Sequence, residues 1–311
     1  MSENHAEINI LVAEDDTVSR LILTSVLKKW GYNPIDVTNG KEALELLTKD
    51  PPLLAILDWV MPELDGIDVV KMFRKANKEA STYIIILTTK TDKEDVIAGL
   101  EAGADDYICK PFDNDELWAR IRVGLRTATL QKKLIETQKA LEYEAVHDPL
   151  TSVLNRRGVF ERLQEELERA ERNNLQTCIA MCDLDYFKKI NDTYGHQTGD
   201  DVLKGFVKLI RSQLRPYDLL GRIGGEEFLI VIPNINKQDA INTLKRLNTT
   251  IQENEIDTIT GKHKITVSIG GILIQGKDTI DSIIKYTDEM LYLAKEKGRN
   301  QVCFKELTNY E

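Results

Sequence analysis

Two rhythms of apolar and polar residues divide the chain into two halves. In the first half, five short apolar runs alternate with amphipathic stretches. Short apolar strands separated by helical patterns are typical of βαβ units. We therefore predict a doubly wound α/β domain with a parallel five-stranded sheet. The predicted strands are 8–13, 33–38, 53–58, 83–88 and 106–111, and helices end near residues 30, 50, 76, 103 and 125.

The second half combines longer helical patterns with apolar runs that pair through a hairpin. This mixture predicts an α+β sheet with helices on one or both faces. The segment between residues 185 and 199 is predicted to be turn-rich. The predicted helices are 156–172, 199–213, 237–252 and 279–297, and the predicted strands are 178–185, 219–223, 227–232, 264–273 and 301–304.

A long helix is predicted to join the halves, because residues 113–146 contain no proline and a single glycine, Gly124. Apolar and threonine residues recur there at alternating spacings of four and three, the a/d rhythm of a coiled coil. The alternative is one amphipathic helix packed on its own domain. We expect domains at 1–121 and 148–311, joined by a coiled-coil linker at 122–147. The seam comprises Val123, Thr127, Leu130, Leu134, Thr137 and Leu141.

Composition narrows the class of protein. The 311 residues carry a net charge of −10 and are 42% hydrophobic, which argues against a non-specific DNA binder and predicts globular domains. No apolar run is long enough to span a membrane. None of the four cysteines lies in a C-x-x-C pair, and the first residues lack signal-peptide features. We expect a cytoplasmic protein that contacts neither DNA nor a membrane.

Charged residues cluster where the strands of the first half end. Asp15 and Asp16 follow the first strand, Asp58 ends the third, Thr88 ends the fourth and Lys110 follows the fifth. Carboxyl ends of parallel strands form the ligand-binding edge of such sheets. Carboxylates about 4 Å apart repel by roughly 4 kcal/mol per pair at a dielectric near 20. A divalent cation relieves this repulsion, and hard oxygen ligands favour Mg²⁺. The alternative is a set of solvated acids at loop starts.

These residues resemble the receiver domain of bacterial response regulators, through "LDWVMPELDG" around Asp58 and "YICKPF" around Lys110. The resemblance covers residues 8 to about 121. It implies a flavodoxin-like fold, phosphorylation of Asp58 by a cognate histidine kinase, and one Mg²⁺. The residues implied are Asp15 and Asp16 for the metal, and Thr88 and Tyr107 for coupling phosphorylation to the face of the fourth helix and fifth strand.

The sequence "RIGGEEFLIV" contains the turn of the predicted hairpin in the second half. Gly224 and Gly225 suit a tight turn that needs positive φ. Glu226 and Glu227 then open a strand, where glutamate is disfavoured. They could face Asp183 or Asp185 at the end of the neighbouring strand, giving a two-carboxylate site for divalent metal. The alternative is a group of solvated acids around a turn.

Further residues favour a nucleotide ligand. Asn191 and Asp200 offer an amide and a carboxylate, which can bind a guanine edge. Lys295 and Arg299 are four apart near a predicted helix end, so both could reach one polyphosphate. The alternative for the Lys295/Arg299 pair is a solvated helix face.

Four motifs in order resemble the GGDEF family of diguanylate cyclases over about 147–305: "HDPLTSVLNRRGVF", "DLDYFKKINDTYGHQTGDDVL", "RIGGEEF" and "YLAKEKGRN". The resemblance implies a palm-like fold and the joining of two GTP into cyclic di-GMP, with two Mg²⁺ ions and release of two pyrophosphates. The form GGEEF is compatible with activity. The implied roles are metal binding by Asp183, Glu226, Glu227 and the Leu184 carbonyl; alkoxide stabilisation by Glu226; guanine binding by Asn191 and Asp200; triphosphate binding by Lys295, Arg299 and amides near Tyr186 and Phe187; and product inhibition at Arg215 and Asp218.

The combined prediction is a phosphorylation-controlled diguanylate cyclase, homodimeric through its receivers and linker helices. Two alternatives belong to other classes. One is an inert cyclic di-GMP receptor that binds through Arg215 and Asp218, and the other is a scaffold that signals by protein contact. The presence of Asp183, Glu226 and Lys295 favours the enzyme, since neither alternative needs them.

Overall fold

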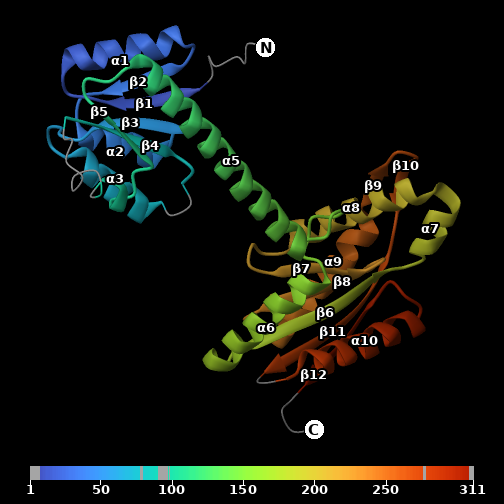
Figure 1. The fold of residues 1–311 in the computed structure, drawn as a ribbon. Coiled ribbons are helices and arrows are strands. Elements are labelled where there is room, and N and C mark those ends of the chain that lie inside the picture. The colour runs from blue at the N-terminus through green and yellow to red at the C-terminus, as the bar shows by residue number, and fades with distance from the viewer. Residues whose placement is uncertain (1–7, 78–79, 90–96, 98, 276–277, 308–311) are drawn as a thin grey trace. The chain divides into compact units, whose positions relative to one another are not determined.

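The computed structural model describes residues 8–77, 80–89, 97, 99–275 and 278–307. The chain forms two compact units, Met1–Lys139 and Ala140–Glu311. Each unit has a five-stranded sheet with its own core (Figure 1).

The first unit contains the predicted parallel sheet, in the order β2-β1-β3-β4-β5. On one face of the sheet, α2 and α3 pack into one core cluster. On the other face, α1 and α5 (Asn114–Val146) pack into another. The doubly wound α/β prediction is therefore confirmed. The helix predicted to end near residue 103 falls partly on residues outside the described ranges. The elements are β1 (Asn9–Ala13), α1 (Thr17–Lys29), β2 (Asn33–Val37), α2 (Gly40–Lys49), β3 (Leu54–Asp58), α3 (Gly66–Ala76), β4 (Tyr83–Thr88) and β5 (Asp106–Cys109).

The predicted long helix is α5 (Asn114–Val146), with 33 residues. At about 1.5 Å per residue it is about 50 Å long. Its buried residues all lie between Leu117 and Ala128, so no residue of its later turns is fully covered within the described chain. The apolar seam residues Val123, Leu130, Leu134 and Leu141 are between 59% and 67% exposed.

The second unit contains a mixed sheet in the order β12-β11-β6-β8-β7, with helices on both faces (Figure 1). Its central strand β6 runs antiparallel to both β11 and β8. The α+β prediction is confirmed. The elements are α6 (Arg156–Asn173), β6 (Gln176–Leu184), α7 (Phe187–Tyr194), α8 (His196–Gln213), β7 (Leu219–Gly224), β8 (Glu227–Pro233), α9 (Lys237–Glu253), β9 (Glu255–Thr258), β10 (Gly261–Lys264), β11 (Val267–Gln275), α10 (Ile280–Glu296) and β12 (Val302–Leu307).

Two elements differ from the prediction. The segment predicted to be turn-rich contains α7, whose eight residues are too few to show a clear helical period. The strands β9 and β10 form a separate two-stranded sheet, and β10 reads GKHK, without apolar alternation. Among the described residues, no helix is long and apolar enough to cross a membrane.

Candidate functional site

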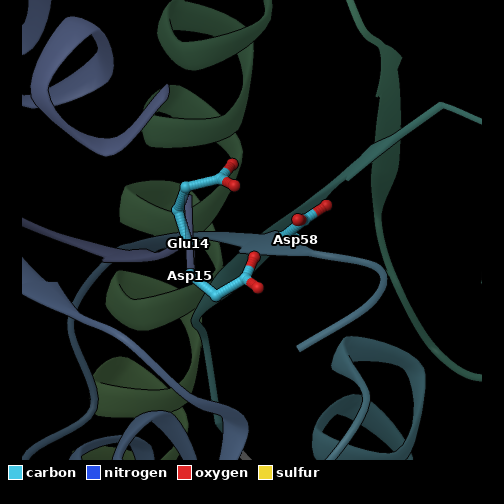
Figure 2. Close-up of side chains that lie close together, drawn as sticks. All are labelled: Glu14, Asp15 and Asp58. Atoms are coloured by element: carbon cyan, nitrogen blue, oxygen red, sulfur yellow. The ribbon is translucent and has the colours of Figure 1, made fainter. Parts of the chain in front are cut away.

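Three carboxylates meet at the carboxyl end of the first sheet. Glu14, Asp15 and Asp58 each offer an oxygen within 4.8 Å of the others (Figure 2). Glu14 is fully buried, and Asp58 is 9% exposed at the end of β3. The edge predicted to gather acids therefore does so.

Lys110 neutralises part of this cluster. Its Nζ lies 2.6 Å from Glu14 Oε2 and 3.0 Å from Asp58 Oδ2. Burial lowers the pKa of Lys110, but its hydrogen bonds to Glu14 and Asp58 outweigh burial and raise the pKa overall. Burial also raises the pKa of Glu14, whose Oε1 is buried without a partner in the described structure. An orphaned carboxylate oxygen beside two further acids fits a divalent cation with hard oxygen ligands.

The prediction that Asp16 is a metal ligand is corrected by the structure. Its Oδ2 accepts a hydrogen bond from the Ser19 backbone N–H at 2.7 Å, so it caps the N-terminus of α1. Hydrogen bonds from Ser19 lower the pKa of Asp16, as expected for a cap held as the carboxylate. The strand β1 ends at Ala13, so Glu14 and Asp15 are the first residues past the sheet edge. Glu14 thus takes the position predicted for Asp16.

The other predicted receiver residues are Asp58 itself and residues on the strands β4 and β5. The Asp58 Oδ1 accepts from the Trp59 backbone N–H at 2.8 Å, while Oδ2 faces Lys110. Thr88 is buried at the end of β4, and its carbonyl accepts from the Lys110 N–H at 2.7 Å. Tyr107 lies half-buried on β5, packed against the core cluster shared with α2 and α3. These positions are compatible with the predicted switch.

In the second unit, the GGEEF segment forms a tight turn, shifted by one residue from the prediction. Gly224 ends β7 and pairs with Glu227, which opens β8. Gly225 and Glu226 therefore make the two-residue connection, and Gly225 takes the positive φ of 44° that favours glycine. Glu226 lies in the turn itself, where its side chain is not committed to a strand face.

Asp183 lies beside this turn near the end of β6. It is paired across the sheet with Glu227, and the Leu184 N–H donates to the Glu226 carbonyl at 3.3 Å. Burial raises the pKa of Asp183, and Lys295, with its Nζ 2.8 Å from Oδ2, partly offsets that rise. Burial and then the charge of Asp183 raise the pKa of Glu226. Two acids that repel each other, with one lysine in contact with Asp183, form a donor set that suits Mg²⁺.

The structure decides between the two aspartates that the sequence left open. All the hydrogen bonds of the Asp185 carboxylate are internal: Thr266 Oγ1 donates at 2.7 Å, Ser268 Oγ at 2.7 Å and the Asn300 N–H at 3.0 Å. A carboxylate with three donors already has its charge compensated. Asp183 is therefore the aspartate available to a metal, and Asp185 is structural.

The residues predicted to bind guanine lie on two neighbouring helices, Asn191 on α7 and Asp200 on α8. A Cβ at Gly199 would lie 1.9 Å from Asn191 Oδ1, so glycine is needed there for α8 to approach α7. Asp200 follows Gly199 directly, and both Asn191 and Asp200 are half-buried. The amide and the carboxylate thus come from two helices that pack closely at Gly199, next to Asp200.

The predicted polyphosphate residues also lie near the end of β6. Lys295 is in the last turn of α10 and contacts Asp183. Arg299 follows that helix, with its guanidinium carbon 5.0 Å from the centre of the Tyr186 ring. Tyr186 has φ of 59° and precedes α7, whose first residue Phe187 is buried. The N-terminal amides of α7 are therefore close to two cationic side chains, an arrangement suited to phosphate.

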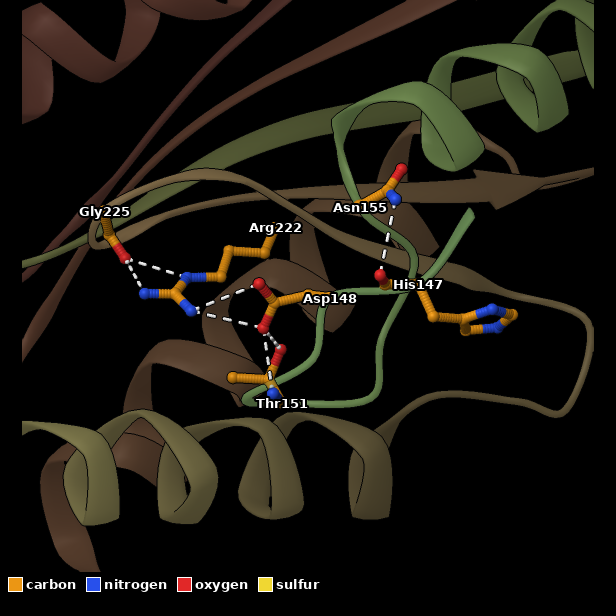
Figure 3. A network of polar contacts seen from close by, with 6 residues as sticks. All are labelled: His147, Asp148, Thr151, Asn155, Arg222 and Gly225. Carbon is orange, nitrogen blue, oxygen red and sulfur yellow. Dashed lines mark hydrogen bonds and ion pairs between the residues drawn. The ribbon is translucent and has the colours of Figure 1, made fainter. Parts of the chain in front are cut away.

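One functional connection was not predicted from the sequence. Arg222 donates from Nε and Nη2 to the Gly225 carbonyl at 2.9 and 2.7 Å, and from Nη1 to the two Asp148 oxygens at 3.2 and 3.3 Å (Figure 3). Asp148 also accepts from the backbone N–H and hydroxyl of Thr151. Asn155 holds the same segment by donating to the Ala145 and His147 carbonyls. The end of α5 is thus connected through Asp148 and Arg222 to the GGEEF turn.

The two residues of the predicted inhibitory site differ in exposure, since Asp218 is buried and the Arg215 side chain reaches the surface. Asp218 is 3% exposed, and its Oδ2 accepts from the Arg215 backbone N–H at 2.7 Å. The Arg215 side chain instead reaches the surface, donating to the Tyr217 hydroxyl at 3.1 Å. Arg215 lines two cavities, of about 280 and 490 Å³. Arg215 is therefore open to a ligand, while Asp218 shapes the turn that presents it.

Comparisons with known proteins agree with this geometry. A sequence profile described as "Diguanylate cyclase, GGDEF domain" matches residues 145–301, and a receiver-domain profile matches residues 10–122. The chain therefore belongs to the GGDEF family, with a response-regulator receiver domain before the GGDEF domain.

Individual relatives share one or both domains. The response regulator PleD of Caulobacter vibrioides is 29% identical over 277 residues, covering 88% of this chain and 61% of PleD. The probable diguanylate cyclase DgcT of Escherichia coli is 37% identical over 174 residues, which are 53% of this chain and 37% of DgcT. The chain thus spans less than two thirds of the length of these curated relatives.

Two crystal structures resemble the chain. The Pseudomonas aeruginosa diguanylate cyclase SiaD, solved with its activator SiaC, has a TM-score of 0.51 and 35% identity, covering 61% of this chain and 73% of that one. The coiled coil and GGDEF domain of DgcB from Caulobacter crescentus, solved with c-di-GMP, has a TM-score of 0.55 and 28% identity, covering 60% and 98%.

Proposed function

We propose that this protein is a diguanylate cyclase that joins two GTP molecules into cyclic di-GMP and releases two pyrophosphates. The observation that carries the proposal is the buried Asp183 at the end of β6, beside the GGEEF turn and in contact with Lys295. Stoichiometry tests it: every two GTP consumed should give one cyclic di-GMP and two pyrophosphates, measured by chromatography and a pyrophosphate assay.

Each group has a distinct task in this reaction. Asp183, Glu226 and the Leu184 carbonyl would hold Mg²⁺, assisted by Glu227, and the ions would supply positive charge to the 3′-oxygen and the triphosphate. Glu226 favours the alkoxide that attacks the α-phosphorus, as pyrophosphate leaves. The guanine is bound by Asn191 and Asp200. The triphosphate is bound by Lys295, Arg299 and the amides near Tyr186 and Phe187.

The reaction requires two GTP-loaded domains, because each holds one nucleotide and the 3′-oxygen of one must reach the α-phosphorus of the other. The exposed seam of α5 favours a second copy of this chain as its partner. Its two threonines weaken a coiled coil and suit a pairing that can change with the state of the receiver. Tethering through receivers and linkers would raise the effective concentration of one domain near the other. The relative DgcB, whose crystallised fragment includes a coiled coil, supports this assignment.

Control by phosphorylation follows from the receiver site. Asp58 would accept a phosphoryl group from a histidine kinase, with Mg²⁺ held by Glu14, Asp15 and Asp58 itself. Lys110 would neutralise the added oxygens, since its ammonium is already 3.0 Å from Asp58. Thr88 and Tyr107 would pass the change to the β4–β5 side of the sheet. A phosphorylated receiver would then shift the population of dimers towards one in which the GTP sites face each other.

The link between Arg222 and Asp148 would hold the GGEEF turn in register with the end of α5. Arg222→Met should lower turnover about 10- to 100-fold, because small misplacement of reacting groups has effects of this size. Steady-state pyrophosphate release measures it. The matched control is Arg157→Met, which removes an exposed arginine paired with Glu161 in the same unit. Unchanged turnover in Arg222→Met would show that the turn holds its geometry without this link.

Product inhibition at Arg215 and Asp218 is the second regulatory proposal. The exposed guanidinium beside two cavities suits the phosphates and guanines of cyclic di-GMP. Arg215→Ala should leave the initial rate unchanged and raise the half-inhibitory concentration of added cyclic di-GMP at least about tenfold, the effect of one charge-assisted contact. Arg157→Ala is the control, because Arg157 is an exposed arginine of α6 that lines neither cavity. An inhibition curve that does not move would place the inhibitory site elsewhere.

A further inference from the structure

The side of α7 away from Asn191 borders a cavity of about 750 Å³. Its walls come from α7, the end of α9, and the segment from β10 into the start of β11. Figure 1 shows α7 and the β9–β10 hairpin at the same end of the second unit. Ligand pockets of proteins typically occupy about 300–1,000 Å³, so this volume is large enough for a small molecule.

The helix α7 separates this cavity from the substrate residues. Lys189, Ile190, Thr193 and Tyr194 line the cavity at spacings that place them on one side of a helix. On another side, Phe187 and Asn191 lie against Gly199 of α8. Of the residues proposed to bind GTP or its metal, Tyr186 lines the cavity at the start of α7, whereas Asn191, Asp200, Asp183 and Glu226 do not.

The cavity combines positive charge with aromatic rings. Lys189 and Lys264 line it, both exposed, and neither has a carboxylate partner within the described ranges. Tyr194 packs edge-on against His263, with ring centres 4.6 Å apart. The acid in its lining is Asp185, whose carboxylate is compensated by its three donors. The net character is cationic and aromatic, which suits a planar anion.

We propose that this cavity is a second ligand site, for an aromatic phosphate of mononucleotide size. Its phosphate would lie between Lys189 and Lys264, and its ring would pack on Tyr194 and His263. The site adjoins the proposed GTP site at Tyr186, and it shares no lining residue with the cavities at Arg215.

Two structural connections would transmit ligand binding in the cavity to the GTP site. The helix α7 carries Asn191 on its other side. The wall residue Thr266 donates to Asp185, which also accepts from the Asn300 N–H next to Arg299. If a ligand in the cavity restrains either connection and so changes the affinity for GTP, GTP must change the affinity for that ligand by the same factor.

The test uses AMP as the probe and isothermal titration of the whole chain with Mg²⁺. We expect saturable binding of one AMP per chain, and at least about tenfold weaker binding by the Lys189→Ala/Lys264→Ala variant and by Tyr194→Ala. Lys208→Ala removes an exposed lysine of α8 outside the cavity and should not change AMP affinity. Asn191→Ala should also leave AMP affinity unchanged, since it lies on the substrate side.

Adenosine and inorganic phosphate test the two halves of the ligand. Each should bind at least about tenfold more weakly than AMP. Phosphate binding as tightly as AMP would overturn the aromatic half, and adenosine binding as tightly would overturn the anionic half. Absence of saturable binding below about 5 mM overturns the site, because affinity weaker than that is little beyond non-specific contact. A loss of AMP affinity in Asn191→Ala with none in the lysine variant would place AMP in the GTP site instead. None of these outcomes depends on turnover, so they are separate from the test of cyclase activity.

Discussion

Glu226→Gln should lower cyclic di-GMP formation at least about 10³-fold, the scale expected when a charged group that stabilises the transition state is removed. Glutamine keeps the shape of the side chain but removes the negative charge that would hold Mg²⁺ and favour the 3′-alkoxide. The fold should remain intact. Glu226 is repelled by Asp183, so neutralising it relieves a repulsion, and the melting temperature should not fall.

Turnover of purified Glu226→Gln, measured by chromatography of the nucleotides, tests this expectation alongside thermal unfolding. Glu161→Gln is the matched control, since it neutralises an exposed glutamate of α6 in the same unit. Turnover close to that of the unchanged chain would remove Glu226 from the metal site. A large fall in melting temperature would instead assign the loss to folding.

Asp58→Asn should abolish the response to a small phosphodonor such as acetyl phosphate. The ratio of rates with and without the donor should fall to about one, because no acceptor remains to shift the dimer population. The basal rate should persist, since Asp58 belongs to the first unit and the residues that would bind GTP all belong to the second. Initial rates across a series of phosphodonor concentrations measure the effect.

Asp65→Asn is the control for this substitution. Asp65 precedes α3 in the same loop region and makes no side-chain capping bond, so its neutralisation should leave activation intact. Activation that persists in Asp58→Asn would point to another input than phosphorylation of this residue.

The predicted architecture rested on strong local signals. The three central strands of the first unit, β1, β3 and β4, are buried on both faces, so they stand out as short continuous apolar runs between amphipathic helices. The unbroken helical stretch after residue 113 likewise predicted α5 well, because neither proline nor a glycine pair interrupts it. Short or polar elements gave no such signal. The eight residues of α7 and the polar strand β10 were missed because neither buries enough apolar residues to impose a period.

The errors at the sites came from register. Counting from the end of the first strand, the sequence offers three acids in a row, Glu14, Asp15 and Asp16, and local pattern does not decide which two face the sheet edge. The structure decides because Asp16 is used as a helix cap. The GGEEF turn shifted by one residue for a related reason: a bulge between Arg222 and Gly224 changes the pairing of β7 with β8.

The link from Arg222 to Asp148 could not be predicted from spacing, because it joins residues 74 positions apart that have no shared local pattern. It connects the linker helix physically to the GGEEF turn. The end of α5 is held by Asn155, the following turn by Asp148 and Thr151, and the GGEEF turn by Arg222 (Figure 3). In the proposed dimer, a change in how the two α5 helices pair would therefore act on the turn that carries Glu226.

Incubation of the whole chain with GTP and Mg²⁺, with and without acetyl phosphate, tests the central claim most directly. The nucleotides are separated by chromatography over time. We expect cyclic di-GMP as the product, with one formed for every two GTP consumed and a higher rate when the phosphodonor is present. Unchanged GTP under both conditions, in a protein that is folded and binds Mg²⁺, would contradict it.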